Sequence, residues 1–366
     1  MTAPKLNLKV DIEPDMARSS SGTLRTLELI YRILLAIFFR FWKLCMSATL
    51  ILLLIYWTQG GIVALVCFIL AILGIFYHAQ DMFLYYPNQP PGSRLYVMSP
   101  DNFGMRYENH FITTKDGVSI NVVLIKHPHP GAATIVYFHG NAGNIGHRMM
   151  IAQAIYLMCH VNILMVEYRG YGKSGGSASE KGLYFDSASS IDFLMQRKDI
   201  DLRKIFILGA SLGGAVAIEL ATNPSYADKF AGLILENTFT SLPDIARSLF
   251  SFKILDYLPT LFFKNKFPSE FRIAKVSLPT LFLSGLDDEL IPPRMMKSLY
   301  EVCGSHSKKL VPFPGGTHNE TSMCPGYFEA IAYFTKEVIE FRSSSTDLGA
   351  ASDSSISLPM PGVNSI

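Results

Sequence analysis

The sequence contains few charged residues and few cysteines, and each scarcity narrows what the protein can be. Charged side chains make up 17% of the 366 residues, compared with about 25% in an average soluble domain. Hydrophobic residues reach 49%, so a membrane-embedded segment is the first feature to look for. The net charge is only +2 and the chain has no zinc-finger or RNA-reader pattern, which argues against a nucleic-acid partner.

The five cysteines form no CxxC pair and show no spacing typical of metal ligands. The sequence therefore predicts no metal centre and gives no reason to expect another cofactor. Cys303 and Cys324 could pair in a disulfide, but free buried thiols are the favoured interpretation. Cysteine usage leaves the redox compartment open.

The N-terminal part of the chain contains a long apolar run. Residues 1–26 are polar and carry both charge signs, which predicts a disordered tail. Residues 27–79 form a predicted membrane anchor, in which an amphipathic stretch up to Lys43 precedes Met46–Tyr77, a run of 32 residues without a charge. A bilayer core needs about 20 helical residues, so this run is long enough to cross a membrane.

Only Thr58–Gly61 interrupts the apolar run, and it leaves two topologies open. Either one transmembrane helix crosses once, or two helices form a hairpin around Gly60; each half would be short for a full crossing, so one helix is favoured. Basic residues before the run place the N-terminus in the cytosol by the positive-inside rule. They are Lys5, Lys9, Arg18, Arg25, Arg32, Arg40 and Lys43. A single crossing makes a type II membrane protein, whereas a hairpin returns the rest of the chain to the cytosol.

Residues 80–342 alternate short apolar runs with helical stretches, which predicts an α/β domain with a mostly parallel sheet and helices on both faces. The predicted strands are Phe111–Thr114, Ile120–Ile125, Thr134–Phe138, Ile163–Glu167, Ile205–Leu208, Gly232–Leu235, Thr280–Ser284 and Lys309–Phe313. The first two form a hairpin, and helices are predicted over Tyr184–Gln196 and Gly213–Thr222. Residues 343–366 are rich in Ser, Gly and Pro and are predicted to be a disordered tail.

One motif carries the strongest chemical signal. A predicted strand ends at Leu208, Gly209-Ala210-Ser211-Leu212-Gly213 follows at once, and a helix begins after it. This is the strand–turn–helix context of a nucleophile elbow, in which a sharp turn exposes a serine above the sheet edge. The positive end of the helix suits a developing anion. Ser211 is therefore the predicted nucleophile.

A serine hydroxyl needs a neighbouring base and an acid that orients it, in the chain order serine, acid, histidine for this turn. Asp288 follows a strand and is the predicted acid, with Asp287 and, more distantly, Glu236 as alternatives. His318 lies in a glycine-rich loop after the last predicted strand and is the predicted general base.

An acyl-transfer site also needs two donors for the oxyanion. The backbone N–H of Leu212, the residue after the nucleophile, is one. The loop His139–Asn144 follows a strand and contains small residues, so the N–H of Asn141 is the predicted second donor. His139 precedes the nucleophile and is expected to brace the loop.

Two further motifs are weaker. Arg169–Gly176 lacks the spacing of a phosphate-binding loop and is interpreted as a tight loop after a strand. Asn319-Glu320-Thr321 matches a glycosylation sequon, but it adjoins His318, where a glycan would crowd the site. The long segment Thr238–Lys275 is rich in aromatic residues and either forms a small helical lid over an apolar acyl site or supplies ordinary packing residues. Those aromatics are Phe239, Phe250, Phe252, Tyr257, Phe262, Phe263 and Phe267.

The combination of motifs resembles the serine-hydrolase branch of the α/β-hydrolase superfamily. The motifs that carry the resemblance are His139–Asn144, Tyr168–Gly172, Gly209–Gly214 and Gly285-x-x-Asp288. The resemblance covers most of residues 46–342. It implies an α/β-hydrolase fold, Ser211, Asp288 and His318 as the charge-relay set, and a single-pass type II membrane protein. Related members remove palmitoyl groups from protein cysteines.

The residues and the resemblance lead to one main functional expectation. It is a membrane-anchored serine hydrolase that cleaves acyl esters or thioesters of a lipid or a lipidated protein. The alternative is a catalytically silent membrane adaptor built on the same fold, which is disfavoured because every triad position is filled.

Overall fold

The computed structural model describes residues 22–249 and 257–353 and divides the chain into two compact units, with the boundary between Ala79 and Gln80. The N-terminal unit contains helix α1, Gly22–Gln59, and most of helix α2, Gly61–Leu84. Phe41 interrupts α1 with non-helical angles (φ −116°, ψ 19°). The kink separates the amphipathic beginning of the helix from its apolar remainder.

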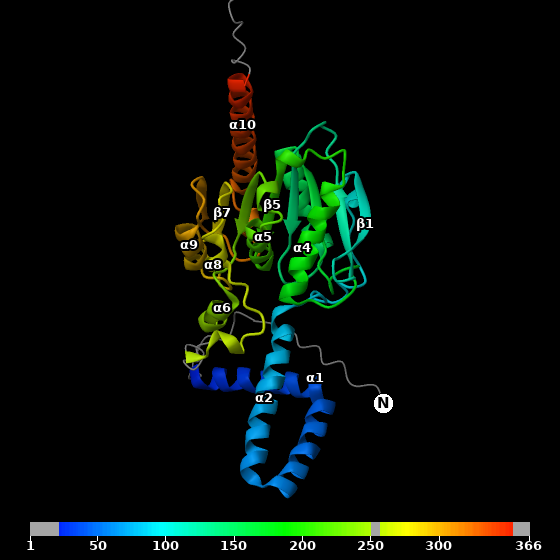
Figure 1. The fold of residues 1–366 in the computed structure, drawn as a ribbon, viewed down its shortest axis with the longest axis vertical. Helices are drawn as coiled ribbons and strands as arrows, with labels where there is room; N and C mark the ends of the chain where they lie inside the picture. Colours follow the sequence, from blue (N-terminus) through cyan, green and yellow to red (C-terminus); the bar gives the residue numbers. More distant parts are fainter. Residues whose placement is uncertain (1–21, 250–256, 354–366) are drawn as a thin grey trace, which may run out of the picture. The chain divides into compact units, whose positions relative to one another are not determined.

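The predicted membrane anchor contains two helices instead of the favoured single helix. Gly60 has φ +91° and ends α1, because this left-handed conformation is open to glycine but strained for other residues. Past the glycine the chain reverses, so that the second limb of α1 and α2 run antiparallel (Figure 1). By length and composition, Ile30–Gln59, which includes the kink at Phe41, and Gly61–Leu84 could each cross a membrane, with mean hydropathies of 1.8 and 2.6. The helices are longer than the two halves of the charge-free run because α1 begins before Met46 and α2 continues past Tyr77.

The second unit is built on an eight-stranded sheet with the order β1-β2-β4-β3-β5-β6-β7-β8. The strands are β1 Tyr107–Thr113, β2 Ser119–Ile125, β3 Thr134–Phe138, β4 Asn162–Val166, β5 Ile205–Ala210, β6 Gly232–Glu236, β7 Thr280–Gly285 and β8 Lys308–Phe313. β1, β2 and β4 pair antiparallel, and all other neighbours are parallel. Every predicted strand is confirmed, with ends shifted by a few residues.

Helices cover both faces of the sheet (Figure 1). They are α3 Met149–Cys159, α4 Glu180–Met195, α5 Leu212–Thr222, α9 Pro293–Val302 and α10 Tyr327–Asp353, while α6 Leu242–Leu249 and α8 Ser269–Ile273 belong to the connection between β6 and β7. Alternate side chains of the strands feed two buried clusters, one shared with α4, α5 and α9 and the other with α3 and α10. Because the central strands are buried on both faces, they read as continuous apolar runs in the sequence. The predicted α/β-hydrolase architecture is confirmed.

The first part of the predicted C-terminal tail, which was expected to begin at residue 343, is helical. Helix α10 continues to Asp353, and residues 354–366 lie outside the described part of the chain, as do residues 1–21 of the predicted N-terminal tail. The hydroxyls of Ser343 and Ser344 donate to carbonyls of the preceding turn instead of ending the helix. Such back-bonding makes serine compatible with a helix, which composition alone did not reveal.

Candidate active site

The predicted elbow around Ser211 is present. β5 ends at Ala210 and α5 begins at Leu212, and Ser211 between them has φ +54° and ψ −120°, a strained conformation typical of functional turns. A Cβ on Gly209 would lie 2.3 Å from the Gly213 carbonyl oxygen, and one on Gly213 would lie 2.0 Å from the Phe138 carbonyl oxygen. Both positions therefore require glycine for the turn to close.

The structure brings the three predicted triad residues together. Nε2 of His318 lies 3.0 Å from Oγ of Ser211, and Nδ1 of His318 lies 2.8 Å from Oδ2 of Asp288. The side chain of Asp288 is 1% exposed and that of His318 is 12% exposed. The other carboxylate oxygen of Asp288, Oδ1, accepts hydrogen bonds from the backbone N–H groups of Leu290 (2.9 Å) and Ile291 (2.7 Å). These bonds fix the carboxylate while it faces the imidazole.

The two alternative acids occupy different positions. Asp287 is exposed to solvent. Glu236 is buried at the end of β6, where its Oε2 accepts a 2.8 Å hydrogen bond from the Tyr327 hydroxyl. Burial raises the pKa of Glu236 above its ordinary value. Its backbone carbonyl accepts a 2.8 Å hydrogen bond from the N–H of Ser211, so Glu236 supports the elbow through its main chain.

The loop His139–Asn144 runs beside the nucleophile. A Cβ on Gly140 would lie 3.5 Å from Cβ and 4.0 Å from Oγ of Ser211, in ordinary van der Waals contact. The N–H of Asn141 has no hydrogen-bond partner among the described residues, and the N–H of Leu212 is in the first turn of α5, where the helix offers no acceptor. Both groups are therefore available at this edge of the sheet.

Asn141 is held by a segment that sequence reasoning did not connect with the site. Its side-chain Nδ2 donates to the carbonyl of Leu84 (3.0 Å), the last residue of α2. Its own carbonyl accepts from the N–H of Tyr86 (2.9 Å) and from the hydroxyl of Tyr171 (2.7 Å). Ala142 also forms an isolated parallel bridge with Tyr86. The chain just after the predicted anchor thus supports the predicted oxyanion loop, a link between distant segments without a local sequence signal.

His139 lies beneath this loop, as expected of a brace. The ring is fully buried, its Nδ1 lies 2.8 Å from the Gly140 carbonyl, and its Nε2 lies 3.2 Å from Oε1 of Glu167. Oε2 of Glu167 accepts from the N–H of Ile145 (3.2 Å). The sequence places Glu167 at the end of a predicted strand without indicating its contact with His139. A glutamate in an apolar run is nevertheless a signal, because a buried carboxylate needs a hydrogen-bond or ion-pair partner.

Arg169 does not face a ligand site. Its guanidinium bonds Asp116 (Nη1 to Oδ2, 2.6 Å) and Asp186 (Nε to Oδ1, 2.9 Å). Burial raises the pKa of Asp186 to about 6, and the arginine opposes this shift. The loop Arg169–Gly176 closes through a 2.8 Å bond from the N–H of Gly170 to the carbonyl of Gly175, in agreement with a tight turn.

The structure also places the predicted glycosylation sequon and the two cysteines Cys303 and Cys324. Asn319 is exposed, but Thr321 is fully buried and its hydroxyl both donates to the Thr317 carbonyl (2.7 Å) and accepts from Nδ2 of Asn237 (2.9 Å). The threonine of the sequon is therefore engaged inside the fold. Cys303 and Cys324 are both free thiols, as the favoured interpretation expects, but only Cys303 is buried and Cys324 is half-buried.

The aromatic segment Thr238–Lys275 divides between packing and surface. Phe239 and Phe267 are core residues, 2% and 0% exposed, so the packing interpretation is correct for them. Tyr257 and Phe262 are exposed, and Phe250 and Phe252 lie outside the described residues. A hollow of about 580 Å³ beside α6 is lined largely by polar side chains and not by the apolar wall that an acyl site predicts. Its lining residues are Thr240, Asp244, Arg247, Ser248, Glu270, Arg294, Met295 and Ser298.

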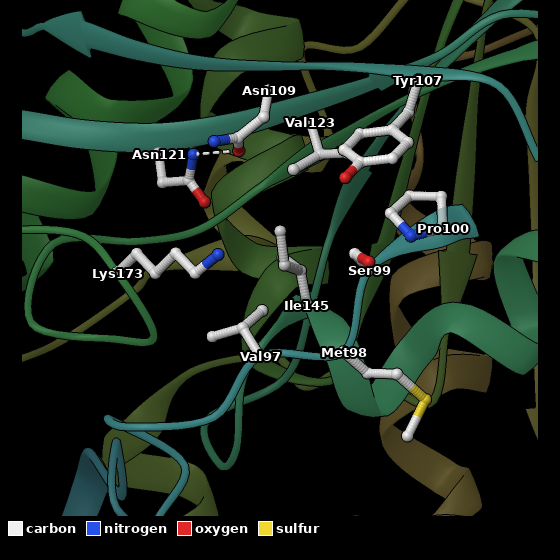
Figure 2. A pocket seen from close by; sticks show the side chains of 10 residues that line it. All are labelled: Val97, Met98, Ser99, Pro100, Tyr107, Asn109, Asn121, Val123, Ile145 and Lys173. Atoms are coloured by element: carbon white, nitrogen blue, oxygen red, sulfur yellow. Dashed lines mark hydrogen bonds between the residues drawn. The ribbon is translucent and has the colours of Figure 1, made fainter. Parts of the chain in front are cut away.

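A second, smaller cavity of about 60 Å³ lies between the chain around Ser99 and strands β1 and β2. Figure 2 shows Lys173 extending toward it from the loop before α4, and the 2.7 Å hydrogen bond from Asn121 to Asn109 on its wall. The cavity has room for about two water molecules, and none of the triad residues lines it.

Comparison with known proteins finds relatives along most of the chain. Protein bem46 of Schizosaccharomyces pombe is 41% identical over 268 residues, covering 72% of this chain and 88% of the relative. The alpha/beta hydrolase domain-containing protein WAV2 of Arabidopsis thaliana is 36% identical over 263 residues, covering 68% of this chain and 83% of the relative. An uncharacterized membrane protein of Saccharomyces cerevisiae, YNL320W, is 38% identical over 280 residues, covering 76% and 95%.

Two further comparisons concern family and fold. Residues 129–270 match the family model described as serine aminopeptidase, S33. Among solved structures, the Pyrococcus furiosus esterase Pf2001 aligns with a TM-score of 0.56 at 19% identity, covering 69% of this chain and 97% of the esterase. This likeness supports the fold of the second unit.

Proposed function

Because the chain belongs to the α/β-hydrolase family, we propose that it is a membrane-anchored serine hydrolase of acyl esters or thioesters with Ser211 as its nucleophile. The observation that carries the proposal is the imidazole of His318, placed between Oγ of Ser211 and the buried carboxylate of Asp288. A hydroxyl, a base and an acid in this order activate the hydroxyl for attack on a carbonyl.

The proposed reaction has two steps. Nε2 of His318 takes the proton of Ser211 as Oγ attacks the acyl carbonyl, and the imidazolium then protonates the departing alcohol or thiol. Water, activated by the same imidazole, hydrolyses the acyl-enzyme and releases the acid. Asp288 keeps Nδ1 of His318 protonated and stabilises the imidazolium. The N–H groups of Leu212 and Asn141 are proposed to hold the oxyanion in both steps.

The two apolar helices support membrane anchoring. The reversal at Gly60 supports the hairpin over the single crossing of a type II protein, because two crossings bring the second unit back to the side of the N-terminus. The basic residues before the anchor then place both in the cytosol. An enzyme bound to a bilayer meets acyl chains there, so the proposed substrate is an acyl lipid or a lipidated protein such as a palmitoyl-protein.

A fluorophosphonate probe tests the nucleophile directly. We expect the full-length protein in detergent to label covalently and Ser211→Ala to lose labelling. Ser241→Ala, altered at a serine in the segment after β6, is the matched control and should label like the parent protein. Absence of labelling in the parent, together with no hydrolysis of acyl esters or thioesters, would favour the silent adaptor.

Topology is tested separately by protease protection in sealed microsomes with a tag at each terminus. The hairpin predicts that protease added outside removes both tags. Protection of the C-terminal tag alone would restore the single-pass type II arrangement.

A further inference from the structure

The segment Tyr257–Lys264, called the cap segment here, presents apolar side chains to the surface. Tyr257 is 84% exposed, Leu261 is 75% exposed and Phe262 is 39% exposed. Leu261 and Phe262 belong to the 3₁₀ helix Thr260–Phe262, and large apolar side chains exposed so close together along the chain carry a cost in water unless something covers them. The exposure of these side chains does not by itself identify what covers them.

The cap segment is tied to the residues that immediately follow the membrane anchor. The side-chain amide of Gln80 makes two hydrogen bonds to the backbone of the cap segment. It donates to the carbonyl of Phe262 and accepts from the N–H of Lys264, each at 2.8 Å. Asp81 forms an ion pair with the Lys264 ammonium and accepts a 2.7 Å bond from Nδ2 of Asn265. Three polar contacts thus fix the cap segment at Gln80 and Asp81, and a fourth fixes Asn265, the residue that follows it.

These two residues mark the end of the apolar part of α2. The helix carries no charged residue from Gly61 to Tyr77, and the polar residues begin at His78. Gln80 is three positions after Tyr77, about 4.5 Å along a helix axis. A bilayer that contains the apolar part of α2 therefore has its surface within about one or two helical turns of Gln80.

We propose that Tyr257, Leu261 and Phe262 insert into the headgroup region of the bilayer that α2 enters, and that the occupant of this surface is lipid. The proposal rests on the membrane anchoring put forward above. Aromatic and lysine residues are enriched at this depth, where an apolar body and a polar tip are both satisfied. Continuity along the chain favours lipid over a protein partner, because Gln80, which bonds the cap segment, comes only three positions after the last residue of the apolar part of α2.

The position of the cap segment gives this contact a functional meaning. The segment lies in the connection that leaves β6 after Glu236, whose carbonyl binds the N–H of Ser211. Lipid contact by this connection would hold the second unit at the bilayer surface, so substrates whose acyl chain resides in the membrane should be favoured over soluble ones.

Depth-dependent quenching tests the contact in the full-length protein. In nanodiscs, a Leu261→Trp reporter is placed in a Trp42→Phe, Trp57→Phe background, which removes both native tryptophans. We expect lipids brominated high on the acyl chain to quench the reporter. Leu157→Trp is the matched control: Leu157 is 57% exposed on α3, close to the edge where β4 begins and away from the edge where β6 ends. It should not be quenched.

Three results would overturn or separate the ideas. An unquenched Leu261→Trp with water-exposed emission overturns lipid contact. Unquenched but blue-shifted emission means that protein, such as a second copy of this chain, covers the patch and also overturns it. Failure of the parent protein to enter nanodiscs is instead a failure of membrane anchoring.

An activity ratio provides a second readout. Because burying a leucine side chain is favourable, Leu261→Glu should lower hydrolysis of a long-chain ester in vesicles about ten- to a hundredfold relative to a soluble short-chain ester. Leu157→Glu should leave that ratio unchanged. An unchanged ratio in Leu261→Glu would contradict the lipid surface, whereas loss of both activities in the parent would contradict the hydrolase itself.

Discussion

The two sides of the proposed catalytic centre are held in place differently. The turn at Ser211 depends on its own glycines, since Gly209 and Gly213 leave no room for a Cβ. The loop His139–Asn144 facing it is held from elsewhere, by Leu84 and Tyr86 on one side and by Glu167 and Tyr171 on the other. The nucleophile turn thus carries a local sequence motif, whereas the contacts that hold the predicted oxyanion loop carry none.

The three residues Ser211, Asp288 and His318 predict the largest effect. Asp288→Asn should lower kcat about 10⁴-fold, because an amide in place of the carboxylate favours the wrong imidazole tautomer. Asp287→Asn is the neighbouring control; its exposed side chain makes no hydrogen bond to His318, so kcat should stay close to the parent value. Steady-state kinetics on a soluble ester measures both. Comparable losses in the two variants would remove the distinction between the aspartates.

The long-range side predicts an intermediate effect. Asn141→Ala removes the bond to the Leu84 carbonyl but keeps the backbone N–H, so it loosens the oxyanion donor without deleting it. Removing a donor entirely costs roughly 10²–10³ in kcat, and we expect loosening to cost about tenfold.

The kinetic signature separates this tether from a general structural role. KM should change little, because the donor acts mainly in the transition state, and Asn141→Asp should not restore the rate, since a carboxylate cannot donate to Leu84. Tyr171→Phe, which removes one of two donors to the Asn141 carbonyl, should cost less than Asn141→Ala. Unchanged kcat in Asn141→Ala would show that the segment after the anchor does not position the loop.

The same contrast explains how much could be predicted from the sequence. The strands were readable because buried parallel strands appear as short apolar runs, and Ser211, Asp288 and His318 follow strand ends in a fixed order. Glu167 and Tyr86 carry no local motif, and their contacts with the loop exist only once β4 and the segment after α2 are folded.

The helical segments were misjudged for a related reason. The number of charge-free residues on each side of Gly60 underestimates the lengths of the two helices, because both helices continue into neighbouring polar residues. The serines after Arg342 suggest disorder by composition, yet two of them bond within α10. Tertiary packing also determines which aromatic side chains of the segment Thr238–Lys275 are buried, since Phe239 and Phe267 lie in the core and Tyr257 does not. Composition reports a tendency, whereas these outcomes depend on neighbours distant in sequence.

The smallest predicted effect concerns the support beneath Ser211. Burial raises the pKa of Glu236 above its ordinary value of 4.5. As pH rises past 4.5, the unfolded chain ionises freely while the folded protein retains the proton, so the free energy of unfolding falls until the pH passes the raised value. Glu236→Gln still accepts from Tyr327 but cannot ionise, and it escapes this loss.

The melting temperature of Glu236→Gln minus that of the parent should therefore increase from pH 4 toward neutrality, by on the order of 2–4 °C. Glu270→Gln, at a less buried carboxylate, is the control for a simple change of charge. Thermal unfolding followed by circular dichroism at several pH values measures the difference. A difference independent of pH would mean that Glu236 is ionised in the folded protein, with Tyr327 and the nearby His318 stabilising its charge despite burial.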